Sequence, residues 1–474
     1  MSNFIEALAA IVGPDQVLAG PAAAPHLTDW RKRYTGAAQA VVRPADTAQV
    51  AAVVRLCAAH RVPLVTQGGN TGMVGGATPD ATGAAIVLLT TRLNRVRALD
   101  PVNDTITVEA GCVLQSIQEA ARAADRLFPL SLAAEGSCTI GGNLATNAGG
   151  TQVLRYGNTR ELALGLEVVD AAGEVWDGLR GLRKDNTGYA LRDLYIGSEG
   201  TLGIITAATL KLFPLPAARC TALLALPDVH AALAVLARAR AGFGPGLTGY
   251  ELMAGICLQM VERHFPQQRL PFAAPGKDAP WFALLELSDA EGEAHARARF
   301  EAVLAEAFEA GEVSDAVIAE SMAQGRALWH LRESITLAQA EAGKSIKHDI
   351  ALPISDIPAF LTETDALLQR RFPGIVNMTF GHLGDGNLHY NVGTSARYDG
   401  AAMSRDELAV YETVHDNVVR FKGSISAEHG VGQLEVDELV RYKSPLELRT
   451  MARIKAALDP LGILNPGKVV GPGA

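Results

Sequence analysis

The sequence predicts a globular protein of two or three domains in which α-helices and β-strands are mixed, and three observations support this. The chain has 474 residues, and one domain commonly takes about 150. Helical and strand-like hydrophobic patterns follow one another along the chain. Glycine is dense before Pro214-Leu-Pro216 and sparse after it, which indicates a domain boundary near residue 216. With 48% hydrophobic and 20% charged residues, the composition excludes a disordered or fibrous protein.

The charge balance argues against nucleic acids and anionic membranes as partners. The sequence has 42 Lys and Arg against 51 Asp and Glu, which gives a formal net charge of −9, and it has no basic block. Binding to polyanions needs clustered positive charge. No apolar run reaches the ~18 residues of a membrane span, and the first residues lack the basic segment of an export or transit signal. We therefore expect no transmembrane segment.

The cysteines predict neither a disulfide framework nor a thiolate zinc site. They are odd in number, scattered along the chain and without a C-x-x-C pair: Cys57, Cys112, Cys138, Cys220 and Cys257. Such a pattern fits a reducing compartment. We expect a cytoplasmic protein in which these residues act as small buried hydrophobic groups.

The first half of the chain predicts a strand–helix–strand unit that leads into a glycine loop. After an N-terminal helical segment, 40–44 has a strand pattern, and Asp46 caps a helical pattern over 47–60. The strand 63–67 then runs directly into Gly68-Gly-Asn-Thr-Gly-Met-Val-Gly-Gly76. Further along we expect strands at 85–90, 105–109 and 204–213, a helix at 113–123 and a hairpin over 164–176.

The second half predicts longer helices that alternate with strands. Ala/Glu/Arg-rich patterns indicate helices at 229–241, 291–310 and 315–340. Strands are expected at 281–287 and 346–352, and a final helix at 445–458. Apolar stretches on both sides of Gly384-Asp-Gly-Asn387 indicate a hairpin with a tight turn.

Three glycine loops in the first half suggest a bound diphosphate. Glycine lets backbone N–H groups approach an anion and permits positive φ. One such loop is weak evidence, because glycine turns are common, but three loops within residues 68–203 are harder to explain as turns alone. None has the G-x-G-x-x-G spacing with an acidic residue about 20 positions later, so the nicotinamide fingerprint is missing. We therefore expect a dinucleotide bound without a Rossmann motif.

Three glycine-rich segments carry a resemblance to a known family: Gln67-Gly-Gly-Asn-Thr-Gly-Met-Val-Gly-Gly76, Gly136-Ser-Cys-Thr-Ile-Gly-Gly-Asn-Leu-Ala-Thr-Asn-Ala-Gly-Gly150 and Ile196-Gly-Ser-Glu-Gly-Thr-Leu-Gly-Ile204. They resemble the FAD-binding domain of the vanillyl-alcohol oxidase / p-cresol methylhydroxylase superfamily. Within it, the chain is similar to the FAD-dependent D-2-hydroxyacid dehydrogenases over about residues 37–470. The resemblance implies an α+β fold with a two-subdomain FAD-binding domain of p-cresol methylhydroxylase type and a ferredoxin-like cap. The implied organisation is an N-terminal helical segment (1–36), the FAD-binding domain (37–216), a substrate-binding cap that carries a metal site (217–440), and a C-terminal segment that returns to the FAD domain (441–474).

The resemblance also implies which residues hold FAD. In relatives with covalently bound flavin, a histidine often follows the Gly-Gly of the first loop; here the residue is Asn70, so we expect non-covalent FAD. Cys138 is the one alternative attachment point, and we interpret it as a loop or core cysteine. The expected cofactor-binding residues are Gln67, Gly68, Gly69, Asn70, Thr71, Gly72, Gly75, Gly76, Gly136, Ser137, Thr139, Gly141, Gly142, Asn147, Gly149, Glu199, Gly200, Ile205, Asn465 and Lys468.

A second constellation suggests a metal. His382 and His389 would face each other across the mouth of the predicted hairpin, and opposed residues have Cβ atoms about 5 Å apart. Glu428 and His429 follow some way along the chain. Two His and one Glu with an open position form the ligand set of a catalytic divalent site, although hairpin-stabilising polar residues and a surface turn would give the same pattern. By resemblance, His382, His389 and Glu428 bind the metal and His429 is the catalytic base. Zinc is favoured, with manganese or cobalt as alternatives.

Candidate substrate anchors lie in the cap. Arginine binds carboxylates in a bidentate way, and Arg332 and Thr336 are four residues apart in a predicted helix, hence on one face. A lone arginine on a helix is more often a solvated charge. By resemblance, however, Arg332, Thr336, Lys347, Asn391 and His429 contact the substrate. This set would hold a distal carboxylate, so a dicarboxylate is favoured over a monocarboxylate such as D-lactate.

The resemblance implies oxidation of a D-2-hydroxyacid to the 2-oxoacid by hydride transfer to flavin N5. D-2-hydroxyglutarate is the favoured substrate, with D-malate as a further one, and electrons would pass to electron-transfer flavoprotein or a quinone. A homodimer is compatible with the sequence. Three rivals stay open: a D-lactate or glycolate dehydrogenase or oxidase subunit of the same family, an oxidase that reduces O₂, and a flavin-binding scaffold without activity.

Overall fold

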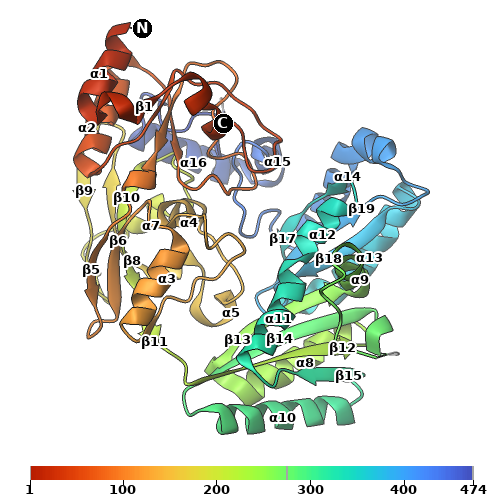
Figure 1. The fold of residues 1–474 in the computed structure, drawn as a ribbon. Helices are drawn as coiled ribbons and strands as arrows, with labels where there is room; N and C mark the ends of the chain where they lie inside the picture. Colours follow the sequence, from red (N-terminus) through yellow and green to blue (C-terminus); the bar gives the residue numbers. More distant parts are fainter. Residues whose placement is uncertain (1, 274–275, 472–474) are drawn as a thin grey trace. The chain divides into compact units, whose positions relative to one another are not determined.

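The computed structural model describes residues 2–273 and 276–471, and the chain divides into two compact units (Figure 1). Unit 1 comprises Met1–Gly149, Gly157–Leu215 and Glu428–Ala474. Unit 2 comprises Gly150–Tyr156 and Pro216–Ala427. None of the helices in the described ranges is both long and apolar enough to cross a membrane.

Unit 1 begins with a small, mainly parallel sheet in the order β1-β2-β4-β3. The expected strand–helix–strand unit is present: α2 links β2 to β3, and the Asp46 side chain caps it by accepting a hydrogen bond from the Gln49 N–H at 2.8 Å. Helix α1 packs on α2. The elements of this part are α1 (Ser2–Val12), β1 (Val17–Leu18), β2 (Ala40–Val42), α2 (Thr47–His60), β3 (Leu64–Gln67) and β4 (Ile86–Leu89).

The second sheet of unit 1 is antiparallel, in the order β5-β6-β10-β8-β9. A buried carboxylate joins it to α2, because Glu167 on β8 accepts a hydrogen bond from the Thr47 hydroxyl at 2.6 Å. The elements are β5 (Val96–Asp100), β6 (Thr105–Glu109), α3 (Leu114–Ala123), β7 (Arg126–Leu127), α4 (Ile140–Thr146), α6 (Thr159–Leu162), β8 (Ala163–Val169), β9 (Val175–Asp177), α7 (Arg192–Tyr195), β10 (Ile204–Lys211) and β11 (Phe213–Pro214).

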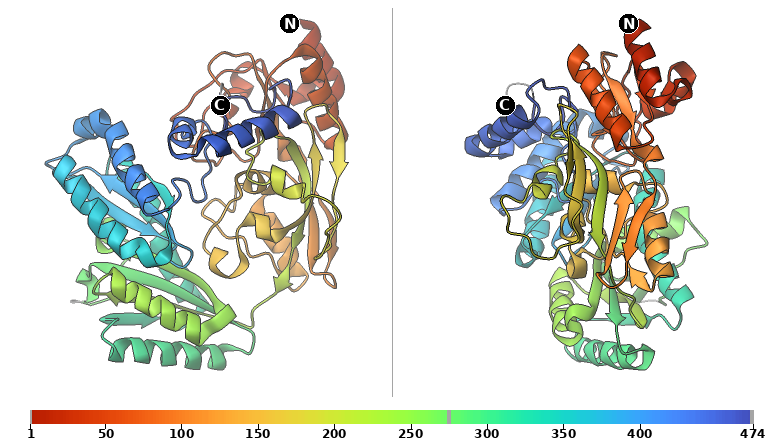
Figure 2. Two further views of the ribbon diagram at one scale, coloured as in Figure 1. Left: turned by 180° about the vertical axis from the view of Figure 1, so that it is seen from behind. Right: turned by 90° about the vertical axis from the view of Figure 1, so that its left-hand side faces the viewer.

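The C-terminal segment returns to the first sheet of unit 1 (Figure 2). It contains α15 (Val436–Tyr442) and α16 (Pro445–Leu458), where Ser444 and Glu447 form a capping box. Leu464 then bridges to Leu64 in parallel fashion. Residues 428–440, which we expected in the cap, belong to unit 1, because their backbone binds side chains and carbonyl groups of the glycine loops.

Unit 2 is built on one large sheet with the order β15-β12-β14-β13-β18-β19-β16, and β17 pairs with β19. Helices α8 and α10 pack into one core cluster, while α9, α11 and α12 pack into another. The elements are α5 (Val153–Tyr156), β12 (Ala218–Leu226), α8 (Val229–Phe243), β13 (Leu247–Ala254), α9 (Gly255–His264), β14 (Trp281–Asp289), α10 (Glu293–Glu309), β15 (Asp315–Ile318), α11 (Met322–Glu333), α12 (Ile335–Glu341), β16 (Ser345–Ile346), β17 (Asp349–Ala351), α13 (Ile357–Arg371), β18 (Val376–Gly381), β19 (Asn387–Gly393) and α14 (Gly400–Arg420).

The predicted helix over 315–340 is wrong in two places. Its first residues form β15, because Asp315–Ile318 pairs with the free side of β12 and sheet pairing outweighs helical propensity. The remainder is divided at Ser334, which ends α11 and precedes α12. The expected strand over 346–352 is also interrupted, since β16 ends at Ile346 and β17 begins at Asp349.

Candidate functional site

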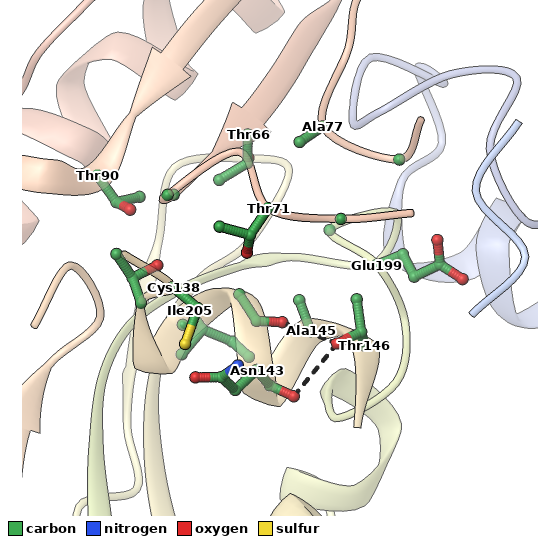
Figure 3. A pocket seen from close by; sticks show the side chains of 18 of the residues that line it. Thr66, Thr71, Ala77, Thr90, Cys138, Asn143, Ala145, Thr146, Glu199 and Ile205 are labelled. Atoms are coloured by element: carbon green, nitrogen blue, oxygen red, sulfur yellow. Dashed lines mark hydrogen bonds between the residues drawn. The ribbon is translucent and has the colours of Figure 1, made fainter. Parts of the chain in front are cut away.

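Unit 1 contains a pocket formed by the three glycine loops, β3 and α4. Figure 3 shows Thr66 and Thr71 on one side of it and the α4 residues Asn143, Ala145 and Thr146 on the other. Of the predicted cofactor residues, those that line it are Gly68, Gly69, Asn70, Thr71, Gly72, Gly76, Thr139, Gly141, Gly142, Glu199, Gly200 and Ile205.

Close packing between the first two loops explains several of these glycines. A Cβ at Gly68 would collide with the Thr139 hydroxyl, and one at Gly69 would collide with the Ser137 carbonyl. Asn70 adopts a left-handed conformation with φ 53°, which asparagine tolerates better than most residues. Its side-chain amide donates to the Thr28 carbonyl at 2.9 Å. The first two glycine loops therefore pack closely against each other, and residues of both line the pocket.

Three polar side chains that line the pocket each have an atom that could form a hydrogen bond with a ligand. The Thr66 and Thr139 hydroxyls and the Asn143 side-chain carbonyl are buried and have no hydrogen-bond partner among the residues that the structure describes. Buried polar groups are normally paired, so these atoms indicate that the pocket accepts a polar molecule. This arrangement fits a dinucleotide such as FAD.

Glu199 ties the third glycine loop to the segment that follows His429. Its carboxylate accepts hydrogen bonds from the Val431 and Gly432 N–H groups, both at 2.7 Å. Burial raises the pKa of Glu199 to about 7 although these two hydrogen bonds act in the opposite direction. His429 itself lines the pocket. The carboxylate thus fixes the backbone just after the predicted catalytic base.

Other predicted cofactor residues act as braces behind the pocket. The Asn465 amide nitrogen donates to the Gly76 carbonyl at 2.9 Å and to the Glu199 carbonyl at 2.7 Å, so it joins the first and third loops. The Gln67 amide donates to the carbonyl groups of His26 and Ala77. The predicted residues that do not line the pocket are Gln67, Gly75, Gly136, Ser137, Asn147, Gly149, Asn465 and Lys468.

The sequence analysis missed about half of the pocket lining. Most of these residues lie inside the three glycine-rich strings or directly beside them, and Thr90 lies outside: Thr66, Val74, Ala77, Thr90, Cys138, Asn143, Ala145, Thr146, Ser198, Gly203 and Ile204. Proximity to the motifs was the only available signal. Burial raises the pKa of the Cys138 thiol to about 11, which is typical of an unreactive cysteine.

In unit 2, the β18–β19 hairpin brings His382 and His389 together. Phe380 is the register partner of His389, and His382 follows directly after β18. The two imidazole centroids are 5.4 Å apart. The hairpin thus places the two rings side by side, and their binding of one shared cation stays a prediction.

Asp349 is a further candidate ligand that the sequence analysis did not select. It is the register partner of His389 on the other side of β19, and its carboxylate lies 3.8 Å from His389 Nδ1. The Asn387 amide donates to Asp349 Oδ1 at 2.9 Å, and the Ala427 N–H donates to Oδ2 at 3.2 Å. Because Glu428 is the next residue after Ala427, the chain enters the predicted ligand segment from beside Asp349.

A buried carboxylate, Glu251, links His382 to the predicted substrate anchor Arg332. Glu251 Oε1 pairs with His382 Nδ1 and Glu251 Oε2 with Arg332 Nε, both at 2.7 Å. Burial alone would raise the pKa of Glu251, but the charges of His382 and Arg332 outweigh it and lower the pKa to about 2. The Arg332 guanidinium lies over the Phe380 ring at 4.9 Å. Arg332 is 7% exposed, so it is not the solvated surface charge that a lone helical arginine usually is.

The other predicted anchors are arranged differently from the expectation. Arg332 ends up in α11 and Thr336 in α12, so the two do not share one continuous helix. Lys347 is half-buried in the break between β16 and β17. Asn391 is buried: its amide nitrogen donates to Gln339 Oε1 at 2.9 Å, and its carbonyl oxygen accepts from the His348 N–H at 3.2 Å.

Comparison with known proteins places these observations in a family. Residues 38–178 match the family described as "FAD binding domain", and residues 215–469 match "FAD linked oxidases, C-terminal domain". The D-2-hydroxyglutarate dehydrogenase of Xanthomonas citri pv. viticola is 42% identical over 447 residues, which are 93% of this chain and 91% of that protein. The mitochondrial D-2-hydroxyglutarate dehydrogenase of Bos taurus is 38% identical over 460 residues, 97% of this chain and 82% of that protein.

Solved structures confirm the predicted fold. p-Cresol methylhydroxylase with substrate bound superposes with a TM-score of 0.78 at 16% identity and covers 99% of this chain and 96% of its own. The α+β fold of p-cresol methylhydroxylase type is therefore correct, and the pocket with its three orphaned polar side chains belongs to a domain that binds FAD. The chain belongs to the family of FAD-linked oxidoreductases that includes the D-2-hydroxyglutarate dehydrogenases.

Proposed function

We propose that this protein oxidises D-2-hydroxyglutarate, and also D-malate, to the corresponding 2-oxoacid. One observation carries the choice of a dicarboxylate: the Arg332 guanidinium is buried in the cap, is held by Glu251, and keeps Nη2 without a partner among the described residues. A buried guanidinium nitrogen that lacks a partner suits a carboxylate. The names of the bacterial and bovine relatives support the same substrate.

FAD held without a covalent bond is the proposed redox cofactor; when bound, it would accept the hydride from C2 of the substrate. Asn70 stands where covalent relatives carry histidine, and its amide is engaged with the Thr28 carbonyl. The glycine edges and the Thr66, Thr139 and Asn143 side chains would hold it. Flavin that stays on the chain after acid precipitation would contradict this proposal.

The proposed metal ligands are His382, His389 and Glu428, with Asp349 close enough to His389 to serve as a further donor. A divalent cation at this set would supply Lewis acidity toward the substrate hydroxyl. Imidazole and carboxylate ligands suit zinc, and manganese or cobalt are alternatives. Asp349 would add a second carboxylate, which increases the negative charge of the ligand set.

His429 is the proposed catalytic base. Histidine is the side chain best suited to accept a proton near neutral pH. It lines the pocket formed by the glycine loops, and Glu199 fixes the backbone directly after it. We propose that His429 takes the proton of the C2 hydroxyl, while Arg332, Thr336, Lys347 and Asn391 hold the substrate.

Anaerobic reduction of the bound flavin tests the substrate. D-2-hydroxyglutarate and D-malate are expected to bleach the flavin absorbance, whereas L-2-hydroxyglutarate, D-lactate and glycolate are expected to do so slowly. A chelator should abolish the bleaching, and added Zn²⁺ or Mn²⁺ should restore it. Faster bleaching by D-lactate or glycolate would replace the proposal by the rival function within the family.

The proposed electron acceptor is electron-transfer flavoprotein or a quinone, because the sequence lacks the nicotinamide fingerprint. Peroxide formed without any added acceptor would indicate an oxidase instead. The bovine relative is named as mitochondrial, and a cytoplasmic location for this chain stays a prediction.

A further inference from the structure

Glu251 stands between two groups to which the proposed function gives separate tasks. It lies in β13 and is fully buried, at 0% exposure. Its two carboxylate oxygens serve different partners: Oε1 binds His382 Nδ1 and Oε2 binds Arg332 Nε. We propose that Glu251 is a positioning residue that orients the metal ligand His382 and the substrate anchor Arg332 at the same time. This inference rests on the proposed function and adds a residue to it.

The bond to His382 determines which ring nitrogen is available to a cation. Nδ1 lies 2.7 Å from Glu251 Oε1, and the His382 side chain is almost completely buried. A carboxylate accepts hydrogen bonds and donates none when ionised, so Nδ1 carries a proton and Nε2 is the ring nitrogen left for a cation. Carboxylates in this position orient metal-binding histidines and increase their basicity.

The bond to Arg332 determines which edge of the guanidinium meets the substrate. Nε is used by Glu251 Oε2, and the guanidinium plane lies over Phe380. Nη2 is buried and has no partner among the described residues. The carboxylate therefore occupies Nε and leaves Nη2 for an anion.

The Glu251 side chain thus sets the spacing between the metal ligand His382 and the substrate anchor Arg332. β13 fixes Glu251 between β14 and β18, so the bridge is anchored in the centre of the sheet. A substrate must have a length that matches this distance in order to contact both the cation and Arg332. Loss of the bridge is therefore expected to weaken metal binding and substrate binding together.

Glutamine at this position tests the bridge with little change in volume. The amide of Glu251→Gln keeps one acceptor oxygen, and its NH₂ group would face the N–H of either His382 or Arg332. A buried donor that faces another donor loses its hydrogen bond and its solvation. The variant therefore retains the packing of β13 but cannot orient both partners.

Glu286 provides a matched control. It lies on the neighbouring strand β14 and is 6% exposed. Its carboxylate accepts a hydrogen bond from Trp329 Nε1, on the same helix α11 as Arg332, at 2.9 Å and one from Thr248 Oγ1 at 3.1 Å. Glu286→Gln therefore disturbs a buried carboxylate that fixes α11 to the sheet and whose hydrogen bonds go to Trp329 and Thr248, not to His382 or Arg332.

The experiment uses the FAD-loaded, metal-free full chain and two separate titrations. Co²⁺ is titrated first and its binding followed by the cobalt absorption bands; D-2-hydroxyglutarate is titrated in a second series without metal and followed by the change in the flavin spectrum. Glu251→Gln is expected to lower the Co²⁺ affinity by roughly 10- to 100-fold and to weaken the binding of D-2-hydroxyglutarate. Glu286→Gln is expected to change neither affinity, although it lowers the melting temperature.

Equal affinities of the two variants in both titrations would overturn the inference. Failure of the wild-type chain to bind Co²⁺ would contradict the proposed metal site and not the role of Glu251 on Arg332, which the metal-free titration decides by itself. If Glu251→Gln does not fold, Glu251→Asp carries the same two measurements, since it retains the charge but withdraws both oxygens. In the wild-type chain, ¹⁵N spectra of labelled histidine are expected to show Nδ1 of His382 protonated, assigned through its loss in His382→Gln; the opposite tautomer would also overturn the inference.

Discussion

Glu251, Glu199 and Asp349 are buried carboxylates that each bind more than one partner. Glu251 connects two side chains, Glu199 connects two backbone N–H groups, and Asp349 accepts from Asn387 and Ala427. A buried charge is tolerated when hydrogen bonds and opposite charges compensate its desolvation. Each carboxylate thus holds either a proposed ligand or substrate anchor, or backbone close to a proposed catalytic or metal-binding residue.

His429→Ala is expected to abolish flavin reduction by D-2-hydroxyglutarate and to leave FAD and metal bound. The imidazole is the proposed proton acceptor, and removal of such a group costs about 10²- to 10⁴-fold in rate. Anaerobic stopped-flow absorbance measures the reduction, and the flavin spectrum and metal content serve as controls. An unchanged rate would remove His429 from the mechanism.

Arg332→Ala is expected to impair the oxidation of D-2-hydroxyglutarate more than that of D-lactate. A charged hydrogen bond contributes about 1.5–3 kcal/mol, so the loss in kcat/KM for the dicarboxylate is expected to exceed about tenfold. Arg332→Lys retains charge opposite Glu251 and separates the loss of the fork from the loss of the buried charge. Equal losses on both substrates would contradict the role of Arg332 at the distal carboxylate.

At the scale of single elements, the local patterns were sufficient for most helices and strands. Asp46 caps α2 as predicted, and the turn at 384–387 forms the expected hairpin, because the signals lie within a few residues of the structure that they specify. The prediction of a helix over 315–340 was wrong because the pairing of β15 depends on β12, which lies almost a hundred residues earlier. Glu251 and Asp349 were missed for the same reason, since neither lies in a motif and each gains meaning only from distant partners.

The link between the third glycine loop and the segment 430–432 is expected to depend on pH. Burial raises the pKa of Glu199 to about 7, above the ~4.3 of a glutamate in an unfolded chain. The contribution of this group to stability is therefore complete below about pH 4.3 and is lost as the pH rises through about 7. Relative to Glu199→Gln, the wild-type chain should lose unfolding free energy between pH 5 and pH 8 in urea titrations. A difference that does not vary with pH would show that the carboxylate is ionised throughout this range.

At the scale of the whole molecule, the chain passes between the two units after Gly149, Tyr156, Leu215 and Ala427. Unit 1 is therefore assembled from three separate stretches of sequence. Asn465 holds two of its glycine loops together, and Leu464 bridges to β3. The boundaries at 149 and 156 could not be predicted, because nothing in the seven residues Gly150–Tyr156 indicates that they pack with a sheet whose strands come later in the chain.

A chain that ends after Asp459 is expected to lose FAD. It lacks the Leu464 bridge and the two Asn465 hydrogen bonds that brace the pocket, while the sheet of unit 2 is left intact. FAD content per chain after gel filtration measures the effect, and a chain that ends after Val470 is the control. Full flavin content in the shorter chain would show that the glycine loops form without the returning segment.

The Asn465 tie has a consequence for biosynthesis. A ribosome adds residues in order, so both glycine loops emerge long before the side chain that fastens them to each other. The nascent polypeptide can complete unit 2 before Asn465 is made, but the flavin cradle closes only after that residue has been added. A product terminated before Asn465 is therefore expected to have a folded cap and no bound flavin.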